Sequence, residues 1–224
     1  MTCVVAEVPG HVAAIRAVGP ELVRQQVELS LGAFPVGAVK TGMLFSREII
    51  EVVAGLGGRL PRLVVDPVMV ASSGDALLQP AAVAAYCERL FPLAALVTPN
   101  LDEARVLLGG DAIGDEAAMH RAGVELVERF GVSFLMKGGH LGGEEAVDLL
   151  CQPDGSVLEF RAPFTRGVST HGTGCTYSAA IAAGLAQGLD LPGAVAQGKR
   201  FITAAVAGSF RWDGVHGLNH WPDR

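Results

Sequence analysis

The chain has 224 residues and a formal net charge of −6, with half of its residues apolar and only 6% aromatic. This charge argues against a nucleic-acid or anionic-membrane partner, because both bind an excess of Lys and Arg. No apolar run reaches the roughly 18 residues of a membrane span. The four cysteines lie far apart, without the spacing of zinc ligands or of a disulfide framework, so we expect a protein of the reducing cytoplasm. The length fits one α/β domain over residues 1–224, and the small apolar side chains suit helices packed on a parallel sheet.

Strands and helices alternate through the first half of the chain. Residues 2–6 are β-branched or small and predict a buried opening strand, and Pro20 stands where the first residue of a helix is expected. Ser46 is a typical N-cap residue before the next apolar stretch. The predicted elements are a strand at 2–6, a helix at 20–31, a strand at 38–40, a helix at 46–56, a strand at 63–66, a helix at 80–91 and a strand at 95–97.

The second half continues this alternation and adds a hairpin around Pro153, Asp154 and Gly155. The predicted elements are helices ending at 108 and spanning 115–130, a strand at 133–136, hairpin strands at 146–151 and 156–160, and helices at 172–187 and 191–208, with no strong periodicity in 214–224. This order predicts a three-layer α/β/α fold with a mostly parallel sheet and an antiparallel edge hairpin. Ligands of such sheets bind at the carboxyl ends of the strands, where we expect the functional residues.

An octapeptide at 169–176, Ser-Thr-His-Gly-Thr-Gly-Cys-Thr, precedes a long apolar helix. Gly172 and Gly174 let the backbone turn its N–H groups toward one anion, and the positive end of the helix dipole adds to the attraction. The same field predicts a lowered pKa for Cys175, whose thiolate would take a proton from an attacking hydroxyl. The alternative interpretation is a glycine-rich turn that caps a packed helix beside a small cysteine.

Polar residues also follow the other predicted strands. Asp66 and the Asn100-x-x-Glu103 pair offer hard oxygen ligands suited to Mg²⁺, although Asn100 and Glu103 also fit a helix capping box that needs no ligand. Lys137 precedes two glycines, which is suited to nucleotide phosphates, the alternative being a solvated lysine before a turn. Met43 follows a strand end and is either a core residue or part of an apolar wall against a flat ring.

Five segments in register carry a resemblance to a known family, and they run in order over nearly the whole chain. They are Val39-Lys40-Thr41-Gly42-Met43-Leu44, Asp66-Pro67-Val68-Met69, Thr98-Pro99-Asn100-x-x-Glu103, Lys137-Gly138-Gly139-His140 and His171-Gly172-Thr173-Gly174-Cys175-Thr176. Each segment is weak alone, but the ordered set is specific. The chain resembles hydroxymethylpyrimidine and hydroxymethylpyrimidine-phosphate kinases of the ribokinase-like superfamily.

The resemblance implies transfer of a phosphoryl group from Mg·ATP to 4-amino-5-hydroxymethyl-2-methylpyrimidine and to its monophosphate, in thiamine biosynthesis. It implies a catalytic anion hole of Gly172, Thr173, Gly174 and Cys175, and ATP contacts from Lys137, Thr98, Asn100 and Thr173. It further implies that Mg²⁺ is organised by Asp66, Asn100 and Glu103, and that the pyrimidine contacts Glu7, Met43, Val68 and Cys175. The expected partners are these small molecules, and the resemblance is compatible with a homodimer.

Two features depart from the family pattern, and both concern the acceptor substrate. Family members begin about forty residues earlier, so the resemblance implies a truncated chain without their first strand and its glycine-rich, aspartate-containing segment. Glu7 stands where the family has a glutamine that grips the pyrimidine, and an ionised glutamate accepts hydrogen bonds but donates none. Two alternatives therefore stay open: activity like that of a pyridoxal kinase, and a catalytically weak remnant that binds nucleotide or pyrimidine.

Overall fold

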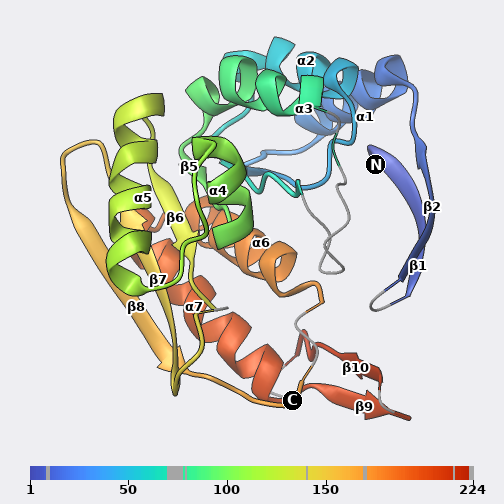
Figure 1. Ribbon diagram of the computed structural model, residues 1–224. Coiled ribbons are helices and arrows are strands. Elements are labelled where there is room, and N and C mark those ends of the chain that lie inside the picture. Colours follow the sequence, from blue (N-terminus) through green and yellow to red (C-terminus); the bar gives the residue numbers. More distant parts are fainter. Residues whose placement is uncertain are drawn as a thin grey trace.

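The computed structural model describes residues 1–8, 11–69, 78, 80–139, 141–168, 171–213 and 215–221, and is built around a six-stranded sheet of order β3-β4-β5-β6-β7-β8 (Figure 1). The strands are β3 (Val39–Thr41), β4 (Leu63–Val65), β5 (Leu96–Val97), β6 (Phe134–Lys137), β7 (Glu145–Cys151) and β8 (Val157–Pro163). The first four are parallel to one another, whereas β7 and β8 form an antiparallel hairpin at one edge. The predicted sheet and its edge hairpin are therefore confirmed.

The helices begin where the sequence signals them. Pro20 is the first residue of α1, and the Ser46 hydroxyl accepts a hydrogen bond from Ile49 N at 3.4 Å at the start of α2. The helices are α1 (Pro20–Ala33), α2 (Arg47–Gly55), α3 (Pro80–Ala85), α4 (Leu101–Leu108), α5 (Glu116–Phe130), α6 (Thr173–Ala186) and α7 (Leu191–Ala207).

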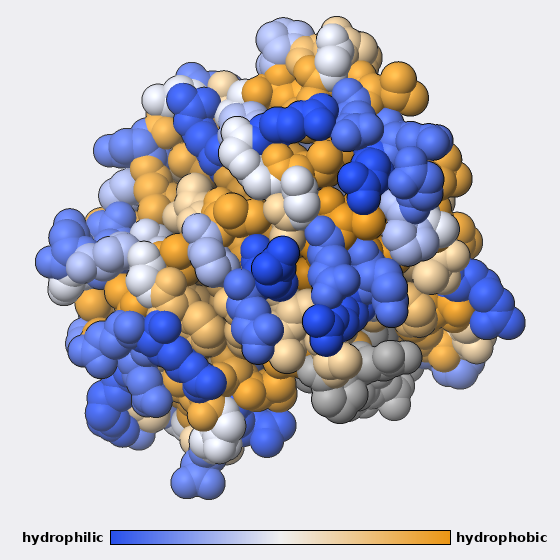
Figure 2. Space-filling view, turned by 90° about the horizontal axis from the view of Figure 1, so that it is seen from above, coloured by the Kyte–Doolittle hydropathy of each residue, from blue (hydrophilic) through white to orange (hydrophobic). Residues whose placement is uncertain are grey.

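Alternate residues of the central strands pack against helices on opposite faces of the sheet. Leu63 and Val65 belong to the apolar cluster covered by α1 to α5, whereas Val64 between them belongs to the cluster under α6 and α7. Both faces are thus buried, which is why the central strands β4 and β5 are apolar at every position. On the outside, the face seen in Figure 2 mixes hydrophilic and apolar residues. In the described part of the chain no helix is long and apolar enough to cross a membrane.

The opening strand is not part of the sheet, so the prediction of a buried strand at 2–6 is wrong. β1 (Cys3–Val8) pairs only with β2 (His11–Ala17), and this antiparallel β1–β2 ribbon stands away from the sheet in Figure 1. Val4 is 58% exposed and Val8 is 60% exposed, because no other described element covers their face of the ribbon. At the base of the ribbon the Thr2 hydroxyl donates to Met43 O at 2.7 Å.

Two further segments differ from prediction. The helix expected at 80–91 is α-helical only in α3 and continues as a π-turn over Tyr86–Leu90 and a 3₁₀ turn over Phe91–Leu93. The wider π-turn brings residues five apart onto one side, so Tyr86 and Phe91 are both fully buried with ring centroids 6.1 Å apart. Near the C-terminus, β9 (Phe210–Trp212) pairs with β10 (Val215–Gly217), strands too short to produce a periodic sequence signal.

Candidate active site

The carboxyl ends of β3, β4, β5 and β6 meet beside a cavity of about 870 Å³. Backbone hydrogen bonds continue beyond the strand ends, with Asp66 N donating to Thr41 O at 3.1 Å and Lys137 N donating to Pro99 O at 3.0 Å. The cavity is lined by most of the predicted site residues, namely Glu7, Met43, Asp66, Val68, Asn100, Glu103, Lys137, Gly172, Thr173, Gly174 and Cys175. The strand-end segments therefore converge as expected. His140, Ser169 and Thr170 lie outside the described residues.

Asp66 is the centre of a polar cluster in this cavity. Its Oδ1 lies 3.0 Å from the ammonium of Lys137, and its Oδ2 lies 3.7 Å from that of Lys40. The Ser178 hydroxyl, one turn into α6, donates to Oδ2 at 3.0 Å. One buried carboxylate thus joins side chains from β3, β6 and α6 at the place where β4 ends.

The charges of this cluster stabilise one another. Burial opposes the ionisation of Asp66, but the nearby Lys137 and Lys40 outweigh it and lower the pKa of Asp66. Burial likewise opposes the charge of Lys137, yet the carboxylates of Asp66 and Glu103 outweigh it and raise the pKa of Lys137. Lys137 is therefore a cation held inside the cavity, where an anion would meet it with little intervening water.

The glycine-rich turn starts α6 as expected and lies against Lys137. Gly172 is the N-cap with φ 81°, a left-handed conformation that favours glycine, and the first helical bond runs from Thr176 N to Gly172 O at 2.9 Å. A Cβ added to Gly174 would lie 3.0 Å from Lys137 Nζ. The ammonium thus approaches the start of the helix, where backbone N–H groups and the helix dipole attract anions.

Cys175 is the third residue of α6, and its exposed side chain opens to the cavity. Partial removal from water and the negative charge of Asp66 raise the pKa of its thiol, with Lys40 and Lys137 acting in the opposite direction. The prediction of a lowered pKa is therefore wrong for the protein without ligand. The helix dipole argument neglected first the removal of the thiol from water and then the carboxylates that face it across the cavity.

Asn100 and Glu103 form a capping box at the start of α4. Asn100 Oδ1 accepts from Glu103 N at 2.8 Å, and Glu103 Oε2 accepts from Asn100 N at 2.8 Å, while Oε1 accepts from Met69 N at 3.2 Å. Burial raises the pKa of Glu103, Lys137 acts against this, and Asp66 reinforces the rise. The structural interpretation of this motif is thus confirmed, and it ties α4 to the segment after β4.

These oxygen donors suit only one kind of magnesium site. Both oxygens of Asp66 and both of Glu103 already accept hydrogen bonds or face an ammonium group. Among the described residues no group of three or more His, Cys, Asp or Glu is placed to hold a metal ion. The chemistry of the set therefore fits Mg²⁺ that keeps its waters and phosphate ligands, and it does not form a protein cage.

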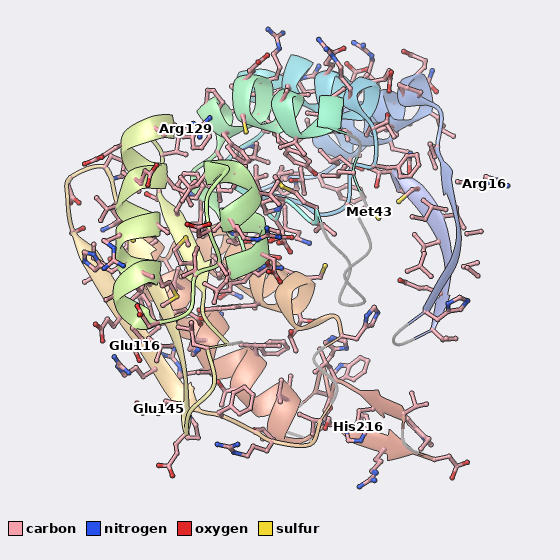
Figure 3. The ribbon with its side chains drawn as sticks, in the orientation of Figure 1. Arg16, Met43, Glu116, Arg129, Glu145 and His216 are labelled. Atoms are coloured by element: carbon pink, nitrogen blue, oxygen red, sulfur yellow. The ribbon has the colours of Figure 1, made fainter. Side chains whose placement is uncertain are left out.

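The other end of the cavity is apolar and lies toward the β1–β2 ribbon. Figure 3 places Met43 on the side of the sheet that faces the ribbon, whereas Arg16 points away from the body. Val68 has φ 44°, which is strained for a β-branched residue, and it lines the cavity two residues after Asp66. Glu7 lines the cavity from β1 and is exposed. Met43 and Val68 thus occupy the positions expected of an apolar wall.

One predicted contact does not reach the cavity. Thr98 is completely buried beneath the strand ends, its hydroxyl has no hydrogen-bond partner in the described part of the chain, and it does not line the cavity. Thr98 follows β5 in the centre of the sheet, where Thr98 N donates to Val65 O at 2.9 Å. A strand-end threonine can point into the core, and the sequence does not indicate which way it turns.

Sequence reasoning gave no role to four residues of this site. Lys40 was part of a recognised segment, but its approach to Asp66 depends on the spacing of β3 and β4. Ser178 gave no signal within an alanine-rich helix. Asp148 and Lys199 also line the cavity, on β7 and α7, and form a buried ion pair at 2.6 Å. A lysine among apolar helix residues and an aspartate within an apolar strand were the signals available.

Comparisons with known proteins agree with this geometry. The profile of the family described as phosphomethylpyrimidine kinase matches residues 1–220. A hydroxymethylpyrimidine/phosphomethylpyrimidine kinase of Rhizobium meliloti is 43% identical over 228 residues, covering 99% of this chain and 85% of the relative.

Solved structures of two related kinases share this fold. A pyridoxal kinase of Bacillus subtilis in complex with ADP has a TM-score of 0.89 at 33% identity, covering 99% of this chain and 85% of that one. A phosphomethylpyrimidine kinase of Clostridium difficile has a TM-score of 0.77 at 36% identity, covering 92% and 84%. Sequence and fold agree, and the chain belongs to the phosphomethylpyrimidine kinase family.

Proposed function

We propose that this protein transfers the γ-phosphoryl group of ATP to 4-amino-5-hydroxymethyl-2-methylpyrimidine and to its monophosphate, in thiamine biosynthesis. The carrying observation is the position of Lys137, whose ammonium lies between Asp66 and the start of α6 in one cavity. A phosphoryl group placed there would meet a cation on one side and helix N–H groups on the other. The apolar wall of Met43 and Val68 would receive the flat pyrimidine ring.

The residues suggest how the transfer proceeds. The substrate hydroxyl oxygen forms a bond to the γ-phosphorus, the bond from that phosphorus to the bridging oxygen breaks, and ADP leaves with the bonding electrons. Lys137 and the amides of Gly174 and Cys175 stabilise the charge on the transferred group. The hydroxyl proton passes to the thiolate form of Cys175, late in the step, because the loose transition state demands little proton removal before attack.

A divalent cation is the remaining component of the proposed reaction. Among the described residues that line the cavity, the five acids Glu7, Asp66, Asp102, Glu103 and Asp148 outnumber the two lysines Lys137 and Lys199, and Lys40 beside Asp66 does not restore the balance. A nucleotide triphosphate alone would be repelled by this excess of negative charge. Mg²⁺ would supply the missing positive charge on the phosphates, and Asp66, Asn100 and Glu103 would orient its waters.

Phosphorylation of pyridoxal is a second candidate function. The solved pyridoxal kinase of Bacillus subtilis has the TM-score of 0.89 and that relative binds ADP, which also supports nucleotide binding by this chain. Glu7 favours this candidate, because an ionised carboxylate cannot donate a hydrogen bond to a pyrimidine nitrogen. Glu7 lines the cavity from the ribbon, within the part of the site that would contact the acceptor.

The test measures ADP release with each acceptor in the presence of Mg²⁺. We expect turnover with the hydroxymethylpyrimidine and its monophosphate, and a lower kcat/KM with pyridoxal. A higher kcat/KM with pyridoxal would favour the second candidate. ATP binding by calorimetry without any transfer would overturn both in favour of a nucleotide-binding remnant.

We further infer a cytoplasmic location from the four free thiols, a property of proteins kept in reducing surroundings.

A further inference from the structure

We propose that Asp148 is a positioning residue for Lys137 and that Lys199 holds Asp148 in place. This inference rests on the proposed function of Lys137 in phosphoryl transfer. Asp148 and Lys199 are 4% and 7% exposed, and they come from β7 and α7, on two different layers of the fold. The Asp148 carboxylate also faces the phenol of Tyr177 on α6. Among the described residues neither Asp148 nor Lys199 contacts Asp66, and the link from Asp148 to Lys137 runs through the backbone.

The connection runs through the peptide that follows Lys137. Asp148 Oδ1 accepts a hydrogen bond from Gly138 N at 3.1 Å, so one carboxylate oxygen holds the first peptide after β6. Lys199 Nζ donates to the other oxygen, Oδ2, at 2.6 Å and to Ala146 O at 2.9 Å. Lys199 therefore fixes the rotation of the Asp148 carboxylate, because both of its acceptors lie on β7.

Close packing around the α-carbon of Gly138 leaves the peptide between Lys137 and Gly138 little room to shift. A Cβ added to Gly138 would collide with Val147 O and would lie 2.8 Å from Met119 Sδ. The backbone of Gly138 is thus pressed against β7 and held by Asp148 at the same point. Because the peptide between Lys137 and Gly138 is fixed, the direction in which the Lys137 side chain leaves the strand is fixed as well.

Stability alone does not require the Asp148–Lys199 pair. The desolvation of two buried charges offsets their attraction, and well-packed apolar residues in place of such a pair commonly leave stability unchanged or higher. The ladder between β6 and β7 also pairs Lys137 with Asp148 through backbone bonds that do not involve these side chains. What the pair adds is an acceptor for Gly138 N beyond the end of that ladder.

The experiment compares two double variants that both lack Lys199. Asp148→Asn/Lys199→Met keeps a side-chain oxygen that can accept from Gly138 N, whereas Asp148→Leu/Lys199→Met removes it, and any direct effect of Lys199 is common to both. We expect kcat to be about tenfold or more lower in the Leu variant, since displacing a catalytic group by about an ångström reduces rates on this scale. Thermal unfolding should confirm that both are folded, with Asp148→Ala/Lys199→Met as replacement if the Leu variant is not.

The same comparison in a Lys137→Met background gives the decisive result. If Asp148 acts through Lys137, the kcat ratio between the two double variants falls to about one once Lys137 is absent. An unchanged ratio, or equal kcat values in the original background, would overturn the proposal. Hydrogen exchange at the Gly138 amide, faster in the Leu than in the Asn variant, tests the contact without any turnover, so failure of the contact is distinguishable from failure of the proposed kinase activity.

Discussion

Lys137 Nζ lies 3.0 Å from Asp66 Oδ1, inside a cavity that an anionic nucleotide would have to enter. In the protein without ligand the charge of this lysine is balanced by the Asp66 carboxylate, and bound phosphates would have to share the lysine with Asp66. Such an arrangement keeps the cation in place before the nucleotide arrives, so little side-chain freedom remains to be lost on binding.

Substitution of Lys137 with Met should lower kcat by about a hundredfold or more, because one preorganised charge donor to the transferred group is lost. Lys40→Met is the matched control, since Lys40 also faces Asp66 but at 3.7 Å and from β3. Steady-state kinetics with ATP as the varied substrate should show a much smaller loss of kcat in the Lys40 variant. Equal losses would mean that neutralising Asp66 is the only contribution of either lysine.

The dependence of rate on pH should reveal the state of Cys175. Burial and Asp66 raise the pKa of this thiol, so at neutral pH only a small fraction is thiolate. A base acts in its deprotonated form, and activity should therefore rise with pH to a midpoint above the ordinary thiol range of about 8.5. In Cys175→Ala this limb should vanish and kcat should fall about a hundredfold. A profile identical to that of the wild type would remove the base role from Cys175.

Val68→Gly should separate stability from substrate binding. The φ of 44° is strained for valine, so glycine should raise the free energy of unfolding by about 1 kcal/mol after its greater unfolded-state entropy is counted. The KM for the pyrimidine should rise several-fold, because part of the apolar wall is lost. Val36→Gly, at a loop position without positive φ, is the control and should be destabilised. Urea unfolding and acceptor kinetics measure both effects.

Asn100→Ala should act mainly on stability. The variant loses the capping acceptor of Glu103 N, which costs about 1 kcal/mol of unfolding free energy, while Asn100→Asp retains an acceptor and should be nearer the wild type. The Mg²⁺ concentration for half-maximal activity should rise only slightly, because Asn100 would orient waters of Mg²⁺ without binding the ion itself. A large increase in that concentration with unchanged stability would instead identify Asn100 as a direct metal ligand.

Glu7→Gln should improve use of the hydroxymethylpyrimidine. A glutamine can both donate to a ring nitrogen and accept from the exocyclic amine, so KM for this acceptor should fall several-fold, equivalent to one added hydrogen bond of about 1 kcal/mol. Glu125→Gln, an exposed position on α5, is the charge-matched control and should change nothing. If the acceptor KM is unaffected by Glu7→Gln, the ribbon does not contact the pyrimidine edge.

The sequence predicted the elements of the central sheet well, because their signals are local. Ser46 and Pro20 begin helices through contacts within a few residues, and the strands are apolar because both faces are buried. The strand at 2–6 was wrongly predicted to be buried for the same reason: its residues have the composition of a buried strand, but their burial depends on what lies beside them. No strand was predicted at His11–Ala17. An alanine-rich partner, β2, carried no strong strand propensity of its own.

The site was predictable as a set of segments but not as a set of contacts. Asp66 and Lys137 were expected at strand ends, yet their pairing arises from the order of β4, β5 and β6 in the sheet. The pKa of Cys175 was predicted in the wrong direction because the helix is local, whereas the removal of the thiol from water and the charge of Asp66 both depend on distant segments. The sign of an electrostatic effect between distant segments can be determined only from the three-dimensional arrangement.

The glycines beside the two lysines that face Asp66 have a simple steric consequence. A methyl group on Gly174 would sit 3.0 Å from the Lys137 ammonium, and one on Gly42 would sit 2.9 Å from that of Lys40. Neither glycine has a positive φ, so both positions could accommodate the backbone of another residue. A larger side chain, however, would meet a lysine ammonium at either position. In this family member a larger side chain at either glycine would push a lysine ammonium away from its place beside Asp66, so the smallness of these glycines belongs to the chemistry of the site.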